Sequence, residues 1–237
     1  LMTEGVSLAG AIESPLVVHL AQRPGPATGL PTRTEQGDLE LALYAGHGEF
    51  PRVIFAPGNL EEALNLTARA FSLADKYQIP VFILTDQYLI DSYYNIERID
   101  VSAFGIERHV VQTDRGYKRY VLTENGVSPR GIPGNGEGLV VVDSDEHDEA
   151  GHLTEDRNIR VRMVEKRLRK GSLLLQEAIS PSLLGTNQGT TMIVCWGSLL
   201  EIAKEAVRRI GRQDLALLHF SQVYPLNPDT AEILKRA

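Results

Sequence analysis

The sequence predicts an α/β fold in which helices cover a largely parallel sheet. Over residues 1–100, short continuous apolar segments alternate with stretches of helical periodicity. Continuous apolar segments are typical of strands buried on both faces, and their alternation with helices is typical of parallel sheets. A second alternation of this kind begins near Thr190, which predicts a second α/β unit.

The first unit is expected to contain three buried strands separated by helices. The expected strands are Leu16–Leu20, Val53–Ala56 and Val81–Leu84. A helix over Leu1–Ala11 precedes the first strand, and a short helix over Thr34–Tyr44 follows it.

The helix between the second and third strands has the clearest signals. Asn59 is a favourable N-cap, and Glu62 three residues later fits a capping box. Apolar residues then recur at helical spacing as far as Tyr77. Pro80 cannot continue a helix, so the helix is expected to end before it.

A long connection is expected between the two units. Ile99–Gly151 has turn clusters but few helical signals, which predicts an irregular or hairpin-rich segment. Thr154 is a candidate cap for a charged helix that runs through Arg169 and breaks near Gly171. Because few of its residues are apolar, this helix is expected to be a solvated linker or to lie on a partner.

The second unit is expected to begin with the apolar strand Met192–Trp196. A helix over Leu199–Ile210, a strand over Leu215–Phe220 and a helix from about Pro228 follow. The expected boundaries are 1–100 for the first domain, 101–188 for the connection and 189–237 for the start of the second domain. The second domain is expected to be incomplete, since two or three units are too few to close a stable sheet.

Composition excludes several classes of protein. The net charge of −7 argues against a nucleic-acid partner, which would require a basic face. No apolar run approaches the roughly 20 residues of a membrane span. No signal peptide is visible, so the expected location is the cytoplasm. Cys195 is the single cysteine, so this chain alone can hold neither a disulfide nor an iron–sulfur cluster, which usually needs four thiolates.

The segment after the first strand is the most informative part of the chain. Between residues 23 and 31 it contains three prolines and two glycines, so it can be neither a helix nor a central strand. Prolines reduce the entropy that a loop loses when it becomes ordered, which predicts a stiff loop. Ligand sites of open α/β sheets lie outside the carboxyl ends of the strands, where this loop would be.

Arg23 and Thr32 are the candidate substrate-binding residues of this loop. A guanidinium group can donate two parallel hydrogen bonds to a carboxylate, and a hydroxyl can bond a carboxylate or keto oxygen. Thr28 and Thr34 add further hydroxyl groups. The structural alternative is that Arg23 pairs with an acid such as Glu35 and that the loop only covers the sheet.

Two other polar segments remain without an assigned role. His47 is a candidate proton carrier, although a histidine in a surface turn is the commoner interpretation. The acidic segment Asp143–His152 contains His147 and several carboxylates, but its spacing matches no zinc or calcium pattern. A solvated turn is the favoured interpretation of this segment.

The loop sequence QRPGPATGLPTRTEQGDL resembles the α subunit of the 2-oxoacid:ferredoxin oxidoreductases, of the type that uses 2-oxoglutarate or related 2-oxoacids. EGVSLAGAIESPLVV, PVFILTDQYLIDS, RYVLTENGVSPRGIPG and HFSQVYPLNPDT resemble family segments in the same order. The resemblance implies an incomplete pyrimidine-binding domain of the thiamine-diphosphate type, followed by an incomplete transketolase C-terminal-like domain.

The resemblance also implies a thiamine-diphosphate-dependent activity. A 2-oxoacid would be oxidatively decarboxylated to acyl-coenzyme A and carbon dioxide, with electrons passed to ferredoxin. Arg23 and Thr32 would bind the substrate carboxylate and neighbouring oxygens. Thiamine diphosphate and Mg²⁺ would be held mostly by the β subunit, because no GDG…N magnesium motif occurs here. Iron–sulfur clusters would lie in the β subunit or in γ or δ subunits, and this chain alone is expected to be inactive.

Two alternatives stay open. The first is a subunit of another thiamine-diphosphate enzyme, such as the β-type subunit of a 2-oxoacid dehydrogenase, which passes its acyl group to lipoate. The second is a non-catalytic subunit that only completes a heteromeric assembly.

Overall fold

The structure is a computed structural model that describes residues 3–98, 100–105, 107–185 and 191–236. Its first sheet has four strands in the order β1-β3-β2-β7. They are β1 (Leu16–Gln22), β2 (Val53–Phe55), β3 (Pro80–Asp86) and β7 (Gln222–Tyr224). β1, β3 and β2 are parallel and β7 is antiparallel to β2, so the predicted α/β class with a parallel sheet is confirmed.

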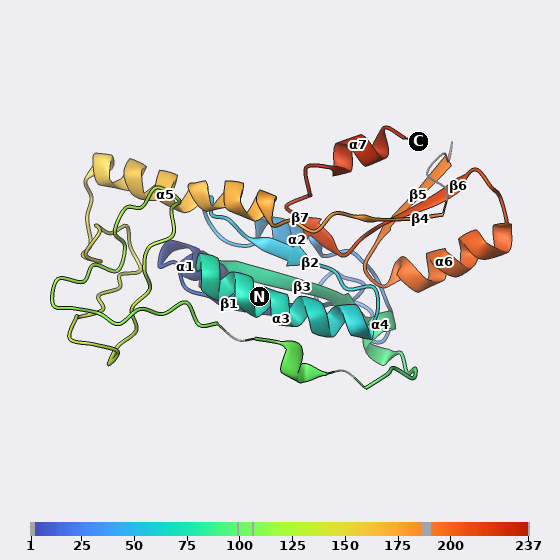
Figure 1. The fold of residues 1–237 in the computed structure, drawn as a ribbon, viewed down its shortest axis with the longest axis horizontal. Coiled ribbons are helices and arrows are strands. Elements are labelled where there is room, and N and C mark those ends of the chain that lie inside the picture. Colours follow the sequence, from blue (N-terminus) through green and yellow to red (C-terminus); the bar gives the residue numbers. More distant parts are fainter. Residues whose placement is uncertain (1–2, 99, 106, 186–190, 237) are drawn as a thin grey trace.

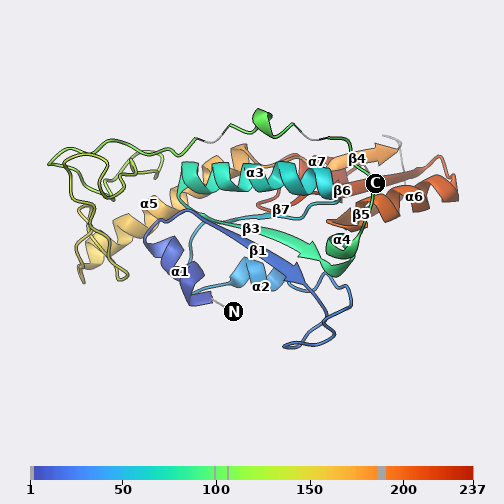
Figure 2. The same ribbon diagram turned by 90° about the horizontal axis from the view of Figure 1, so that it is seen from below.

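Helices cover both faces of this sheet, as Figure 2 shows. α3 (Leu60–Tyr77) lies on one face, and α1 (Thr3–Ala11) and α2 (Leu39–Tyr44) lie on the other. Alternate strand residues point to opposite faces. The core under α3 includes Val53, Phe55, Val81, Ile83 and Ala70. The core on the α1 and α2 side includes Ile54, Phe82, Leu84, Val6 and Ala42.

Residues near each end of α3 explain where this helix begins and ends. Oδ1 of Asn59 accepts a hydrogen bond from the backbone N–H of Glu62 over 2.9 Å, which confirms the N-cap. The Glu62 carboxylate reaches one residue further back than a capping box requires, and accepts from the backbone N–H of Gly58 over 2.8 Å. Gln78 ends the helix with φ of 55°.

Two expectations for the first unit were wrong. β1 is only half-buried along most of its length, because it is the edge strand of the described sheet. α2 begins at Leu39 rather than Thr34, since residues 34–38 belong to the loop that precedes it. A short helix that we did not expect, α4 (Gln87–Asp91), follows β3.

The second sheet lies at the opposite end of the molecule from the irregular segment, as Figure 1 shows. Its order is β4-β6-β5, with β6 antiparallel to β4 and parallel to β5. The strands are β4 (Ser182–Gly185), β5 (Thr191–Trp196) and β6 (Leu215–Phe220). β5, β6 and α6 (Leu199–Ile210) confirm the sequence prediction, whereas β4 was not expected. α7 (Thr230–Leu234) is the last helix described.

The boundaries 1–100, 101–188 and 189–237, and the transketolase-like assignment of the last range, stay predictions. β7 comes from the last range but pairs with β2 of the first sheet. None of the described helices is both long and apolar enough to cross a bilayer.

The connection is irregular, which was one of the two structures that the sequence predicted for it. Its described part contains a 3₁₀ turn, η1 (Val101–Ala103), and isolated bridges rather than extended hairpins. Three such bridges lie in its described part: Val110 to Arg130, Thr113 to Gly136 and His147 to Leu153.

The charged helix α5 (Arg157–Gln176) differs from expectation at both ends. Asp156 caps it instead of Thr154, accepting from the backbone N–H groups of Asn158 and Ile159. The helix continues through Gly171, so no break occurs there.

α5 is also not a solvated linker. Five of its side chains are buried: Met163, Lys166, Arg167, Lys170 and Leu174. Lys166 and Lys170 pair with Glu13 of the first unit, and Leu174 joins the core under α3. Two of these are lysines, which satisfy their charge inside the protein rather than in water.

Candidate functional site

The loop of residues 23–38, called the Arg23 loop below, begins where β1 ends. It leaves the carboxyl end of the sheet and projects from it on the side of α2, as Figure 2 shows. β3 ends beside β1, with Gln22 opposite Asp86. The loop therefore lies where open parallel sheets place their ligands.

Gln22 fixes both ends of the Arg23 loop. This side chain is 2% exposed. Its amide nitrogen donates to the carbonyl of Thr85 over 3.3 Å, and its amide oxygen accepts from the backbone N–H of Asp38 over 3.1 Å. One buried amide at the end of β1 thus joins the last residue of the loop to β3.

The second half of the loop has two more anchors. Oγ1 of Thr34 accepts from the backbone N–H of Tyr88, at the start of α4, over 3.3 Å. Nε2 of Gln36 donates to the carbonyl of Trp196, at the end of β5, over 2.9 Å. The loop is thereby attached to both sheets.

The tip of the loop is held by its own backbone. The N–H of Leu30 donates to the carbonyl of Pro24 over 3.0 Å. Gly29 has φ of +53°, and a Cβ atom at this position would lie 1.7 Å from the same carbonyl oxygen. The close approach therefore requires glycine.

Arg23 is exposed on this loop. Its Nε donates to the carbonyl of Thr28 over 2.9 Å. Within the described residues Arg23 forms no ion pair, so the alternative partner Glu35 does not neutralise it. Among the described residues, its terminal guanidinium nitrogens have no hydrogen-bond partner.

Thr32 is exposed on the same loop. Its carbonyl and its hydroxyl both lie within hydrogen-bonding distance of Nη1 of Arg33, at 3.1 and 3.5 Å. No hydrogen bond joins Thr32 to Arg23 among the residues that the structure describes. The structure therefore puts both predicted residues on one stiff loop without direct contact between them.

The turn of residues 196–198, called the β5–α6 turn below, lies against the end of β3. The hydroxyl of Ser198 hydrogen-bonds to Oδ2 of Asp86, and the other carboxylate oxygen caps α4 through the N–H of Leu89 over 2.9 Å. Asp86 is 2% exposed, so this carboxylate is a fixed link between the two sheets.

His219 supports the same turn from β6. Its Nε2 lies 3.0 Å from the carbonyl oxygen of Gly197, and the ring is fully enclosed. Burial lowers the pKa of His219, although the hydrogen bond to Gly197 opposes the shift. The imidazole is therefore neutral near pH 7 and serves as a structural donor.

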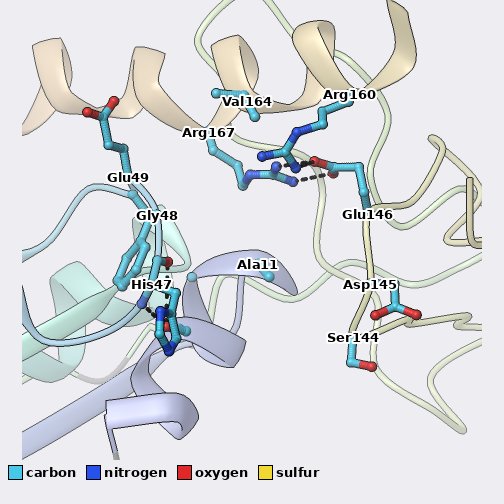
Figure 3. A pocket seen from close by; sticks show the side chains of 13 residues that line it. Ala11, His47, Gly48, Glu49, Ser144, Asp145, Glu146, Arg160, Val164 and Arg167 are labelled. Carbon is cyan, nitrogen blue, oxygen red and sulfur yellow. Dashed lines mark hydrogen bonds and ion pairs between the residues drawn. The ribbon is translucent and has the colours of Figure 1, made fainter. Parts of the chain in front are cut away.

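His47 lies in a separate hollow of about 420 Å³ between α1, α5 and residues 144–146, shown in Figure 3. The two arginines of this hollow are already paired. Glu146 accepts from Nη1 of Arg160 over 2.9 Å and from both terminal nitrogens of Arg167 over 2.9 and 2.8 Å. His47 forms no ion pair with a described residue, and its backbone N–H donates to the hydroxyl of Ser7.

The acidic segment Asp143–His152 is partly buried rather than a solvated turn. His147 is fully enclosed, stacks on Tyr120 at 3.9 Å between ring centroids, and contacts the carbonyl of Asp145 through Nδ1 over 3.0 Å. Burial lowers the pKa of His147. This histidine packs two parts of the connection against each other.

The donor set at the Arg23 loop fits a carboxylate and not a metal. Guanidinium and hydroxyl groups recognise anionic oxygens, whereas Mg²⁺ prefers carboxylate, carbonyl and water oxygens. Among the described residues, no three His, Cys, Asp or Glu side chains are grouped so that they could hold a metal ion. Burial raises the pKa of the Cys195 thiol, which makes it less reactive.

Sequence reasoning identified the loop but missed its anchors. Gln22, Gln36 and Asp86 lie at the ends of predicted elements, and no motif marks them. Gln36 donates to a residue 160 positions away, so its partner depends on tertiary structure.

The parallel strands, with helices on both faces and a stiff loop at their carboxyl ends, define an open α/β domain. The family model "Pyruvate flavodoxin/ferredoxin oxidoreductase, thiamine diP-bdg" matches residues 1–166. The chain belongs to this family of thiamine-diphosphate-binding domains.

Two relatives of the chain are subunits of enzymes named for 2-oxoacids. It is 37% identical over 232 residues to 2-oxoacid:ferredoxin oxidoreductase 1, subunit alpha, from Sulfurisphaera tokodaii, covering 95% of this chain and 36% of that protein. It is 31% identical over 248 residues to the 2-oxoglutarate synthase subunit KorA of Methanocaldococcus jannaschii, covering 99% of this chain and 64% of that protein. The chain therefore spans about a third of the Sulfurisphaera relative.

A solved structure has the same fold. The 2-oxoglutarate:ferredoxin oxidoreductase from Magnetococcus marinus, with 2-oxoglutarate, coenzyme A and succinyl-CoA bound, matches with a TM-score of 0.88 and 31% identity. The match covers 98% of this chain and 41% of that chain. The predicted resemblance to α subunits of this family is confirmed by these matches.

Proposed function

We propose that this chain is part of the α subunit of a coenzyme A-dependent 2-oxoacid:ferredoxin oxidoreductase. The enzyme would oxidatively decarboxylate a 2-oxoacid such as 2-oxoglutarate to acyl-coenzyme A and carbon dioxide, and pass electrons to ferredoxin. The family match and the names of the relatives support this activity.

The observation that carries the proposal is the state of Arg23. A guanidinium on a stiff loop, at the carboxyl edge of a parallel sheet and without an acidic partner in the described chain, suits an anionic ligand. The carboxylate of a 2-oxoacid provides two oxygens for parallel hydrogen bonds. Arg23 would therefore hold and orient the substrate through its carboxylate.

Thr32 would complete the substrate contact. Its hydroxyl is exposed on the same loop and can donate to a carboxylate or keto oxygen. Arg33 lies against the Thr32 carbonyl and limits the freedom of this residue. The two side chains would meet the substrate from two points of one loop.

The cofactor arrangement is part of the proposal. Thiamine diphosphate would supply the nucleophilic carbon that attacks the 2-oxo group, and it would be held with Mg²⁺ mostly by a β subunit. Iron–sulfur clusters would likewise be held by partner subunits, with γ or δ subunits where the complex has them. This chain would bind the substrate and exclude water from it.

The test is an assay of the complex formed with the β subunit. The full α chain, co-purified with its partner, is supplied with a panel of 2-oxoacids, coenzyme A and a viologen dye. Dye reduction that depends on both coenzyme A and a 2-oxoacid is expected. A requirement for lipoate would instead indicate a 2-oxoacid dehydrogenase, and turnover that is indifferent to Arg23→Ala would indicate an assembly subunit.

A further inference from the structure

The Arg23 loop has no core of its own, so its position depends on a few polar contacts. Its tip is bonded only within itself among the described residues, through Arg23 to Thr28 and Leu30 to Pro24. Its contacts with the rest of the chain are made by Gln22 and by the second half of the loop. Displacing the second half would therefore displace Arg23 and Thr32.

Gln36 makes the one hydrogen bond that we find between the described part of this loop and the second sheet. Nε2 donates to the Trp196 carbonyl over 2.9 Å, and the side chain is partly buried. The same amide nitrogen packs on Gly197, where a Cβ atom would lie 3.1 Å away. Gly197 also has φ of +59°, so the turn brings its backbone close to Gln36 without a side chain between them.

The acceptor of this bond is rigidly placed. The Trp196 side chain packs in the cores of both sheets. Gly197 donates its N–H to the carbonyl of Phe220 over 3.3 Å and accepts from His219. Ser198 is bonded to Asp86 at the end of β3. The β5–α6 turn is therefore held in one position and can anchor the Arg23 loop.

The contacts form a closed path. From Gln22 it runs through Thr85 to Asp86 along β3, then through Ser198 to Trp196, and finally through Gln36 back into the loop. A loop held at both ends of such a path has fewer accessible positions than a loop held at one end. Gln36 is the member of the path closest in sequence to Thr32 that reaches outside the first unit.

We propose that Gln36 is a positioning residue, which holds the Arg23 loop against the β5–α6 turn so that Arg23 and Thr32 meet the substrate together. This inference rests on the proposed function of the loop. Gln36 itself need not touch the substrate, because it acts through the position of the loop. Its loss should lower affinity for the 2-oxoacid and leave affinity for coenzyme A unchanged.

The test compares three substitutions in the full α chain assembled with its β subunit. Gln36→Leu keeps the approximate size and removes the donor. Gln36→Glu also removes the donor and places an anion against the carbonyl of Trp196. Gln36→Lys keeps a donor and should partly rescue the contact. Gln112→Leu is the matched control, since Gln112 is exposed and makes no side-chain hydrogen bond with a described residue.

The first readout is steady-state kinetics. A neutral hydrogen bond contributes about 1 kcal/mol, which corresponds to roughly a fivefold change in affinity. Gln36→Leu should therefore raise KM for the 2-oxoacid about fivefold, with a smaller change in kcat and none in KM for coenzyme A. The effect should follow the order Glu, Leu, Lys, from largest to smallest. A purely structural defect would instead lower the active fraction, and so kcat, without this split.

The second readout is hydrogen–deuterium exchange of the assembled complex, which requires no turnover. Faster exchange in peptides that cover residues 23–38, with the peptides of α3 unchanged, is expected for Gln36→Leu. Unchanged exchange of the loop would overturn the inference, and so would faster exchange with an unchanged KM for the 2-oxoacid.

The two readouts separate this inference from the proposed function. A wild-type complex that turns over no 2-oxoacid would overturn the proposed function, while exchange would still decide whether Gln36 fixes the loop. If Gln36→Leu does not assemble, Gln36→Glu, which also lacks the donor, is compared with Gln36→Lys, which keeps one.

Discussion

Oε2 of Glu13 lies 2.5 Å from Nζ of Lys170, and both side chains are 1% exposed. Lys166 pairs with the other oxygen of the same carboxylate. Lys170 also reaches the carbonyl of Gln78, at the end of α3, over 3.4 Å. One buried carboxylate thereby joins the end of α1 to α5 and explains why this charged helix lies on the first unit.

The first prediction concerns this buried carboxylate. Glu13→Gln should destabilise the protein by about 3–5 kcal/mol, because it leaves two buried ammonium groups without a counter-charge. Glu205→Gln on the surface of α6 is the control, since an exposed pair such as Glu205 with Arg208 contributes little to stability. Unfolding in guanidinium chloride measures the stability of both variants. Equal stability of Glu13→Gln and the wild type would contradict the structural role of the pair.

The second prediction concerns acid unfolding. Burial raises the pKa of Glu13, but the ammonium groups of Lys170 and Lys166 outweigh it and bring the pKa to about 2. The folded pKa is thus below the usual 4.5, so the unfolded state binds more protons between these values. Stability from this group is present above about pH 4.5 and lost as the pH falls toward 2. Glu13→Gln should flatten the stability profile in this range, measured by urea midpoints against pH.

The third prediction concerns Gly171. It lies inside α5, and a Cβ atom there would meet nothing within 4 Å. Gly171→Ala should therefore stabilise the protein by about 0.5–1 kcal/mol, because alanine loses less backbone entropy than glycine in a helix. Thermal unfolding measures the change. A lower melting temperature would show that α5 is not continuous at this residue.

The fourth prediction concerns Gly29. Gly29→Ala would place Cβ against the carbonyl of Pro24 in a left-handed conformation, at a cost of roughly 1–3 kcal/mol. Because the tip is exposed, the tip should rearrange and KM for the 2-oxoacid should rise, with little change in melting temperature. Gly116→Ala is the control, since its Cβ would meet Asp114 only at an ordinary 3.6 Å. An unchanged KM for the 2-oxoacid would show that the tip of the loop does not affect substrate binding.

Much of the architecture could be predicted because it follows from local patterns. The apolar strands, the cap at Asn59 and the bounds of α6 are all encoded by neighbouring residues. β4 and β7 were missed because each is short and depends on a distant strand for its pairing. The sequence could not reveal that β1 is the edge of the described sheet, since burial depends on neighbours.

The charged residues show the same limit most clearly. The composition of α5 predicts a solvated surface, but Lys166 and Lys170 are buried on a carboxylate more than 150 residues earlier in the chain. Likewise, the Arg23 loop could be identified from its prolines and glycines, whereas Gln36 and Asp86 acquire their roles only from partners in the second sheet. The spacing of apolar residues predicts which face of a helix or strand is buried, but it does not predict polar contacts between residues far apart in the sequence.

The central claim is that Arg23 binds the carboxylate of the substrate. The most direct measurement is KM and kcat/KM for the preferred 2-oxoacid in the assembled complex, for wild type, Arg23→Ala and the remote surface control Arg115→Ala. Loss of a charge-assisted hydrogen bond should lower kcat/KM of Arg23→Ala roughly 10–100-fold through a higher KM. Arg115, which pairs only with Glu137 among the described residues, should change neither value. Unchanged kinetics for Arg23→Ala would contradict the claim.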